Sequence, residues 1–152
     1  MVFEHDYNAF PELSNSQLEV LQFSSPHKQI TSDFSGTVVK VHDGDTVTLQ
    51  TAFRDFDFPL RLANIDAPEM NNGGDVARDW LKAKIENKDV QVLINFDNRV
   101  GKYGRLIGDI LINGMSVGTE MQYLGLVSEF GKKLESMVPN VHQWTNSKQW
   151  FS

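Results

Sequence analysis

The stretch Thr37–Leu49, TVVKVHDGDTVTL, predicts a β-hairpin and marks the start of a strand-rich domain. β-branched residues recur at alternate positions before Asp43-Gly44, and a second β-rich run begins at Thr46. An Asp-Gly pair between two such runs is a strong signal for a tight turn. We therefore expect two antiparallel strands whose connecting turn carries Asp43 and Asp45.

Three more strands are predicted downstream of this hairpin, at residues 58–63, 90–96 and 106–112. In the first of them Phe58, Leu60 and Leu62 share one face, so Arg61 is expected to point away from the core. Pro59 is expected to mark an edge or the start of that strand, because proline cannot donate to a ladder. Asn113-Gly114 predicts a hairpin turn after the last strand.

One amphipathic helix is predicted between the third and fourth strands. Ala77, Leu81 and Ile85 recur every fourth residue, and the helix is expected to begin near an Asp75 cap and to end near Asn87. Shorter helices are predicted at residues 117–124, before Gly125, and at residues 130–137, before Pro139. The order predicts an α+β fold: a five-stranded OB-fold Greek-key β-barrel with two to three helices.

The chain has 152 residues, 40% of them hydrophobic, which suits one domain with its own core plus appendages. We expect the barrel domain at residues 34–138. Residues 1–33 form an N-terminal arm with one short helix capped by Ser16, and the arm is either loosely docked or a tether to a protein partner. The aromatic tail, residues 139–152, is expected to pack on the domain.

Composition narrows the partners and the metal chemistry. The net charge of −6 argues against a protein that coats nucleic acid through a broad basic surface, so an anionic substrate must be held locally. The absence of cysteine leaves oxygen atoms as the expected metal ligands. No membrane span or secretory signal is visible, which favours an intracellular place or a larger assembly, although a secreted form with its signal removed stays open.

Asp45 and Asp66 are the candidate metal ligands. Each follows or ends a predicted strand, so the two carboxylates can converge at one rim of a barrel and bind Ca²⁺ or a similar cation. Asp43 would lie close by as a charge partner. The alternative is that Asp43-Gly44-Asp45 is an ordinary hairpin turn.

Arg61 and Arg105 are the candidate phosphate ligands. Two guanidinium groups can hold the equatorial oxygens of a phosphodiester as charge develops on them, and lysine would not replace them equally well. The alternative for each arginine is a surface salt bridge of little energetic value.

Glu69 follows Asp66 by three residues, beyond Pro68, and could accept a proton from an attacking water. Alternatively it caps a turn or pairs with an arginine. Lys102 and Tyr103 could contact a terminal phosphate or stack on a base of a flexible single strand, or they could simply form a turn with Gly104.

These motifs together resemble the thermonuclease (micrococcal nuclease) family. Asp43-Gly44-Asp45-Thr46, Arg61-Leu62 through Ile65–Glu69, Tyr103-Gly104-Arg105 and Gly125-Leu126 occur in the family's order and at similar spacing, over residues 35 to 127. The resemblance implies an OB-fold, Ca²⁺-dependent phosphodiesterase that cleaves DNA and RNA with little sequence preference and leaves 3′-phosphate ends. It also implies the following roles: Asp45, Asp66 and the backbone carbonyl of Ala67 bind Ca²⁺, Arg61 and Arg105 bind the phosphate, and Glu69 is the base.

The chain also departs from the family pattern. Gly101 replaces an aspartate that is frequent before Lys102, the loop after Glu69 is short, and Glu129-Phe130-Gly131 replaces a tyrosine-bearing segment. The chain is acidic, whereas the best-known member is basic. These departures leave open a second function, in which a nuclease-like barrel serves as a binding or structural module of a larger assembly, such as a virus particle, and docks through residues 1–33.

Overall fold

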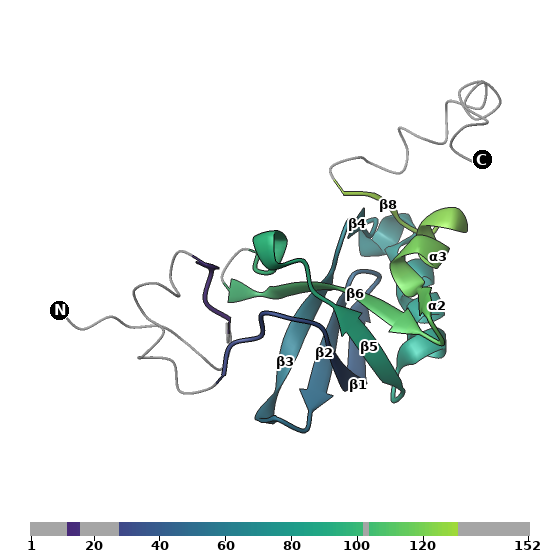
Figure 1. Cartoon of the computed structure of the whole chain (residues 1–152). Helices are drawn as coiled ribbons and strands as arrows, with labels where there is room; N and C mark the ends of the chain where they lie inside the picture. The colour runs from purple at the N-terminus through teal and green to yellow at the C-terminus, as the bar shows by residue number, and fades with distance from the viewer. Residues whose placement is uncertain (1–11, 16–27, 102–103, 131–152) are drawn as a thin grey trace.

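Strands β1 (Phe34–Asp43) and β2 (Thr46–Thr51) form the predicted hairpin in the computed structural model, which describes residues 12–15, 28–101 and 104–130 (Figure 1). Their antiparallel ladder runs from Thr37 opposite Gln50 to Asp43 opposite Thr46. The turn that joins them is therefore the Asp43–Asp45 segment that the sequence indicated.

Within the described residues, ten further elements follow the hairpin. The strands are β3 (Arg54–Leu62), β4 (Ile65–Asp66), β5 (Asp89–Leu93), β6 (Leu106–Ile112), β7 (Met115–Ser116) and β8 (Ser128–Glu129). The helices are α2 (Gly74–Ile85) and α3 (Val117–Tyr123), with short 3₁₀ turns η2 (Met70–Asn72) and η3 (Phe96–Asn98).

Five strands close into a barrel, which confirms the predicted OB-type fold. Their order is β3-β2-β1-β5-β6, and a parallel pairing of β3 with β6 joins the two ends, with Leu60 opposite Leu106 and Arg61 opposite Ile107. The strands are antiparallel everywhere else in the ladder. Closure protects the edges of β3 and β6, which an open sheet would leave unpaired.

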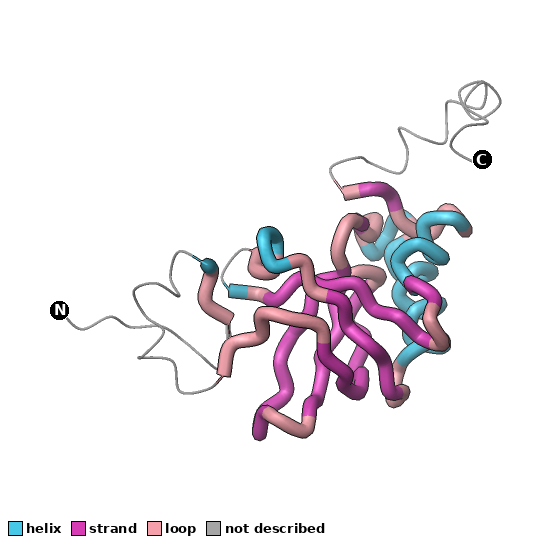
Figure 2. Tube along the Cα trace, in the orientation of Figure 1, coloured by secondary structure: helices cyan, strands magenta, loops and turns pink. Residues whose placement is uncertain are grey.

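The core lies inside the barrel and between the barrel and its helices. Strand residues that alternate in sequence are fully buried, and α2 contributes the predicted stripe of Ala77, Leu81 and Ile85. Helices α2 and α3 lie together on one side of the barrel, as Figure 2 shows. The described N-terminal residues 12–15 lie on the side away from them.

Of two local expectations, the one for Pro59 is met as a strand edge, and the one for the cap of α2 was wrong. Strand β3 begins at Arg54, so Pro59 does not start it. Pairing with β6 begins only at Leu60, and the side of β3 toward β6 is therefore still an edge at Pro59. Helix α2 begins at Gly74 after Gly73, whose φ of 100° is left-handed, and Asp75 lies in its first turn and not at the cap. Gly73 can adopt this backbone because it has no Cβ.

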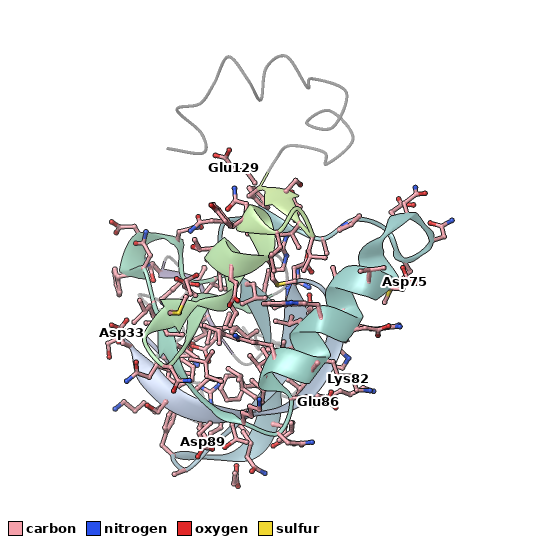
Figure 3. The ribbon with its side chains drawn as sticks, turned by 90° about the vertical axis from the view of Figure 1, so that its right-hand side faces the viewer. Asp33, Asp75, Lys82, Glu86, Asp89 and Glu129 are labelled. Atoms are coloured by element: carbon pink, nitrogen blue, oxygen red, sulfur yellow. The ribbon has the colours of Figure 1, made fainter. Side chains whose placement is uncertain are left out.

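The outer side of α2 is charged. Figure 3 shows Asp75 toward one end of the helix and Lys82 with Glu86 toward the other. Glu86 also ties the helix to the barrel, because its carboxylate accepts a hydrogen bond of 2.9 Å from the backbone N–H of Val41. No helix in the described ranges is long and apolar enough to cross a membrane.

Parts of several sequence predictions lie outside the described residues. These are the arm helix at Ser16, most of the helix expected at residues 130–137, and the aromatic tail at residues 139–152. Of the arm, residues 12–15 and 28–33 are described, and Glu12, Leu13 and Ile30 are buried.

Asp109 on β6 gives a prediction about stability and pH. Burial raises the pKa of this carboxyl, and the hydrogen bond of 2.7 Å from the Ser116 hydroxyl opposes the rise. Because the folded-state pKa is raised, ionisation of Asp109 destabilises the folded protein. This destabilisation is absent below the ordinary aspartate pKa of about 3.9 and complete above the folded-state pKa. Asp109→Asn keeps an acceptor for Ser116, so it should raise the free energy of unfolding at pH 7.

Urea denaturation at several pH values would check this expectation. The advantage of Asp109→Asn over the unmodified chain should grow as pH rises from about 3.5 to 7. The same substitution at Asp55, an exposed residue of β3, is the control and should give a much smaller change. An advantage that shrinks with rising pH would contradict the prediction.

Candidate active site

The β1–β2 turn is packed tightly against two other segments, and Gly44 makes this possible. A Cβ added at Gly44 would lie 2.8 Å from the Cβ of Ala77 on α2 and 3.0 Å from the Cβ of Ala67 after β4. Contacts this short are not tolerated between real side chains. The missing side chain therefore lets the turn touch both segments, and it brings Asp45 next to the Asp66–Ala67 peptide.

Asp45 is fixed by hydrogen bonds from its own turn and from the β3–β4 region. Its carboxylate accepts from the backbone N–H of Ala67 at 2.8 Å and from the Thr46 hydroxyl at 3.0 Å. Its backbone carbonyl accepts from the N–H of Leu62 at 2.8 Å. In turn, the Asp45 N–H donates to the Asp43 carboxylate at 3.0 Å. The carboxylate is thus held in one orientation before any ligand binds.

Arg61 lies between the two candidate metal ligands. Strand alternation turns Leu60 and Leu62 inward and Arg61 outward, as expected. One terminal nitrogen, Nη2, lies 2.5 Å from Asp66 Oδ1 and 3.4 Å from Asp45 Oδ2, and Nη1 donates to the carbonyl of Leu62 at 2.7 Å. The side chains of Arg61 and Asp45 are only 13% and 14% exposed, whereas that of Asp66 is 35% exposed, so the contact with Asp45 is the better shielded from water.

The two turn carboxylates differ in their affinity for protons. Burial, the largest cause, and the side-chain hydrogen bond with Asp43 raise the pKa of Asp45 to about 6, against the opposing effects of the Ala67 N–H and Arg61. For Asp43, burial acts upward, but the hydrogen bonds with Asp45 and Thr46 together lower its pKa. Positive charge near Asp45 would therefore stabilise the carboxylate form.

Glu69 lies on a rigid turn beyond this cluster. Its carbonyl accepts from the N–H groups of Asn72 and Gly74, and a Cβ at Gly74 would lie 2.3 Å from the Pro68 carbonyl oxygen, so this turn requires glycine. The Glu69 side chain is exposed. Within the described residues no hydrogen bond or ion pair joins its carboxylate to Asp45, Arg61 or Asp66.

Arg105 lies immediately before β6, beside the strand of Arg61. Its backbone carbonyl accepts from the N–H of Gly101 at 2.8 Å, and its side chain is partly buried. Since Leu106 and Gly108 face the core, residues 105 and 107 lie on the outer face that Arg61 also occupies. Lys102 and Tyr103 lie outside the described residues.

The structure thus unites Asp43, Asp45, Arg61, Asp66 and Ala67 at one rim of the barrel, with Glu69 and Arg105 on adjoining segments. One neighbour was not foreseen: the ring of Phe130 lies 5.8 Å from the Arg61 guanidinium carbon. It is positioned by the β4–β8 pairing and by its N–H, which donates to the carbonyl of Asn64 at 2.9 Å. Strands of two residues leave no periodic signal from which this contact could be found.

The described ranges contain no group of three or more histidine, cysteine, aspartate or glutamate side chains suited to a metal ion. The candidate metal site therefore has two carboxylate ligands, Asp45 and Asp66. The two carboxylates converge on one point, now held by Arg61 Nη2. Hard oxygen donors of this kind suit Ca²⁺ or Mg²⁺, with water, backbone or substrate oxygens completing the coordination. The arginines next to them suit a phosphate.

The fold and this rim define a small OB-fold domain that combines paired carboxylates with outward-facing arginines. The family described as Staphylococcal nuclease homologue matches residues 59–146, which is 88 of the 152 residues. The chain belongs to this family, which confirms the thermonuclease resemblance of its motifs.

Individual relatives show moderate similarity. An uncharacterized endonuclease of Escherichia coli O157:H7 is 34% identical over 98 residues, covering 63% of this chain and 61% of the relative. A micrococcal nuclease of Shigella flexneri is 37% identical over 78 residues, 51% of this chain and 42% of its own length. A staphylococcal-like nuclease of Arabidopsis thaliana is 40% identical over 70 residues, 45% of this chain and 21% of its own. The chain therefore spans less than two thirds of the relatives that it matches.

Gly44→Ala tests the packing that brings Asp45 to the rim. The added methyl group cannot fit between Ala67 and Ala77, so the turn must move, at a cost of about 1–3 kcal/mol in the free energy of unfolding. Gly118→Ala on α3 is the matched control. The closest atoms to its added Cβ are 3.8 Å away, and alanine favours a helix, so its stability should be equal or higher. Denaturation midpoints that fall equally in both variants would contradict this account.

Proposed function

We propose that the chain is a divalent-cation-dependent nuclease that hydrolyses phosphodiester bonds of DNA and RNA, with Ca²⁺ as the cation and 3′-phosphate ends as products. The convergence of Asp45 and Asp66 on one point beside Arg61 is the observation that carries the proposal. Membership of the nuclease-homologue family supports the same reaction class.

Asp45 and Asp66 would hold the cation, together with the backbone carbonyl of Ala67. The fit rests on their oxygen chemistry, their convergence, and the raised pKa of Asp45, about 6, which nearby positive charge would lower. Asp43 would act on the site through its hydrogen bonds with Asp45. A bound Ca²⁺ supplies charge that neutralises the phosphate and favours hydroxide over water.

Arg61 would bind the scissile phosphate. Of its five N–H donors, one bonds to Leu62 and one to Asp66 within the described residues, and Nη2 also lies 3.4 Å from Asp45, so the Nε–H and the second Nη1–H remain for phosphate oxygens. Nη2 would give up its place between the two carboxylates to the cation, while the bond from Nη1 to the Leu62 carbonyl can remain and hold the guanidinium group near the site. Its hydrogen bonds to equatorial oxygens strengthen as these oxygens gain charge in the transition state.

Arg105 would act as the second phosphate ligand, since its position on the outer face next to β3 lets both guanidinium groups approach one substrate. Glu69 would take the proton of the attacking water. Its exposure and its fixed turn suit a base that meets a water molecule at the surface of the site. Lys102 and Tyr103 are proposed to contact single-stranded or frayed ends.

Cleavage of a short single-stranded DNA and a matching RNA in Ca²⁺ tests the function. We expect hydrolysis in Ca²⁺, loss of hydrolysis in excess EDTA, and a fall of roughly 10²–10⁴-fold in kcat for Glu69→Ser. End analysis of the products should show 3′-phosphates. Glu86→Ser, which alters the glutamate that follows the C-terminal end of α2, is the control and should retain cleavage when folded.

Each result has its own consequence. A folded protein without cation-dependent cleavage would refute the nuclease proposal. Cleavage that survives Glu69→Ser at full rate would refute the role of Glu69 alone.

The net charge of −6 favours the second candidate function, a binding module of a larger assembly that contacts a protein partner through residues 1–33. That function predicts nucleic-acid or protein binding with no hydrolysis under any cation.

A further inference from the structure

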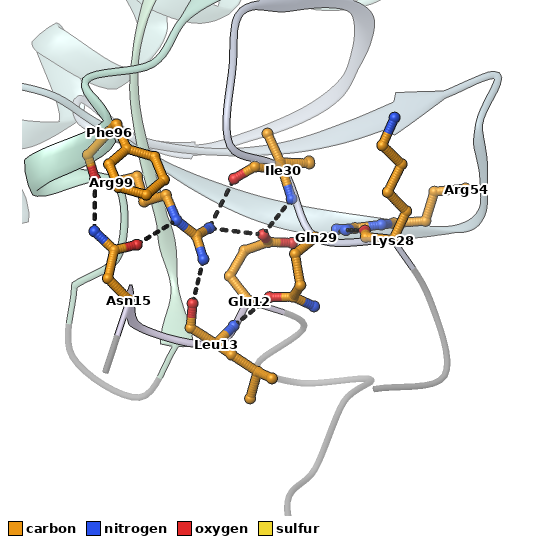
Figure 4. A network of polar contacts seen from close by, with 9 residues as sticks. All are labelled: Glu12, Leu13, Asn15, Lys28, Gln29, Ile30, Arg54, Phe96 and Arg99. Carbon is orange, nitrogen blue, oxygen red and sulfur yellow. Dashed lines mark hydrogen bonds and ion pairs between the residues drawn. The ribbon is translucent and has the colours of Figure 1, made fainter. Parts of the chain in front are cut away.

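A buried ionic network lies between the barrel and the N-terminal segment, on the side away from the helices. It joins this segment to the η3–β6 loop. Glu12 and Arg99 are both almost completely inaccessible to water, and they are 87 positions apart in the chain. Figure 4 shows the Arg99 guanidinium enclosed by residues of the N-terminal segment. A charged pair at this depth needs a reason, because removing each charge from water is costly.

Arg99 directs its donors at the N-terminal segment. Its Nη1 donates to the Glu12 carboxylate at 3.2 Å and to the Ile30 carbonyl at 2.7 Å, and its Nη2 donates to the Leu13 carbonyl at 2.5 Å. Its Nε donates to the Asn15 side chain at 2.9 Å. Four hydrogen bonds therefore fix the guanidinium group, and the start of the η3–β6 loop is fixed with it.

Glu12 and Asn15 complete the attachment. The Glu12 carboxylate also accepts from the N–H of Ile30 at 2.8 Å and lies 2.7 Å from Arg54 Nη2. The Asn15 amide donates to the carbonyl of Phe96 in η3 at 2.9 Å (Figure 4). Glu12 thus balances two buried arginines, Arg54 at the start of β3 and Arg99 in the η3–β6 loop.

The same loop carries Arg105. It begins at Arg99, whose carbonyl accepts from the N–H of Ile107 at 2.8 Å, and the Gly101 N–H donates to the Arg105 carbonyl. The backbone N–H of Glu12 donates to the carbonyl of Gly104 at 3.3 Å, one residue before Arg105. The N-terminal segment therefore holds this loop at two places: by side chains at Arg99 and by the backbone at Gly104.

We propose that Glu12 and Arg99 are positioning residues that set the place of Arg105 for catalysis. Glu12 is linked to Arg105 through the loop at two places: its carboxylate anchors Arg99 and its N–H anchors Gly104. The N-terminal segment is then a part of the working site and not an appendage. This inference rests on the proposed nuclease function, because Arg105 matters only if it binds phosphate.

A double-mutant cycle measures whether Glu12 acts through Arg105. Glu12→Gln keeps an acceptor for Ile30 but removes the charge that holds Arg99. We expect kcat for a short single-stranded DNA in Ca²⁺ to fall roughly 10- to 100-fold, as small displacements of a catalytic group do, with KM changed less than kcat. In the Arg105→Ala background the same change should have almost no further effect. Equal losses of kcat in both backgrounds would overturn the proposal.

Two further variants separate positioning from simple loss of folding. Among the described residues, Asn15→Ala removes the bonds to Arg99 and Phe96, so it should fold and show a smaller loss of the same kind. Ile85→Val loosens the buried face of α2, and when the folded protein is assayed its kcat should match that of the unmodified chain. A kcat loss for Ile85→Val equal to that for Asn15→Ala would mean that the effect is general, and would overturn the proposal.

Amide hydrogen exchange tests the attachment without using activity. In Glu12→Gln the N–H groups of Gly101 and Ile107 should exchange faster, while that of Leu62, bonded to Asp45, should not. Unchanged exchange at Gly101 and Ile107 would overturn the proposal whether or not the protein cleaves DNA. An unmodified protein that does not cleave refutes only the proposed function, and the exchange result then decides the attachment by itself.

Discussion

Replacement of Arg61 by lysine is expected to lower kcat by roughly 10²–10³-fold, the effect of losing one well-placed donor to transition-state charge. The lysine keeps the positive charge near Asp45 and Asp66, but it cannot hold a carboxylate and a phosphate with one planar group. The free energy of unfolding should therefore change little while catalysis is lost. Single-turnover cleavage of a short single-stranded DNA, together with urea denaturation, measures both quantities.

Arg78→Lys is the matched control for this substitution. Arg78 lies on α2, where it pairs with the neighbouring Asp79 at 3.0 Å and is partly exposed, and its Nη1 also donates to Met70 Sδ at 3.9 Å. Its replacement should leave kcat within about twofold, because exposed ion pairs contribute little. If Arg61→Lys retained a third or more of the activity, Arg61 would be a structural partner of the carboxylates and no phosphate ligand.

Glu12→Leu should destabilise the domain by about 3–5 kcal/mol, the usual cost of leaving buried charge uncompensated. The reason is specific: Glu12 is the carboxylate that meets both Arg54, at 2.7 Å, and Arg99, at 3.2 Å, and all three side chains are at most 1% exposed. Domains have a total free energy of unfolding of about 5–15 kcal/mol, so a loss of this size should lower the denaturation midpoint markedly.

A triple variant distinguishes buried charge from lost packing. Replacing Glu12 by leucine and both Arg54 and Arg99 by methionine removes all three charges, and it should recover much of the stability that the single change loses. Glu86→Leu is the control, because its carboxylate has one backbone hydrogen bond and a distant lysine, so it should cost about 1 kcal/mol. A triple variant less stable than Glu12→Leu would show that the arginine stems and their hydrogen bonds matter more than charge balance.

Local patterns account for the parts of the fold that were predicted correctly. The hairpin at Thr37–Leu49 and the Ala77, Leu81, Ile85 stripe follow from periods of two and about 3.6, which short segments carry by themselves. The cap of α2 was misplaced because an acidic residue and a left-handed glycine are both common at helix starts, and the backbone angle at Gly73 decides between them.

The candidate site was only partly predictable, for a similar reason. Asp45, Arg61 and Asp66 could be grouped because each lies at a strand end or on an outward face, and the closed barrel brings these places together. The network at Arg99 could not be found, since an arginine in a loop is ordinarily exposed and its partners are 69 to 87 positions away. The same holds for Phe130 beside Arg61.

The parallel pairing of β3 with β6 has a consequence for folding kinetics. It joins Leu60 to Leu106, so the loop that must close is long, and contacts of this separation form late in folding. Under the proposed function, Arg61 and Arg105 would face a common substrate only after this closure. Catalytic activity should therefore return with the slowest phase of refolding, after most secondary structure has formed, and a partly folded chain should be harmless to nucleic acid.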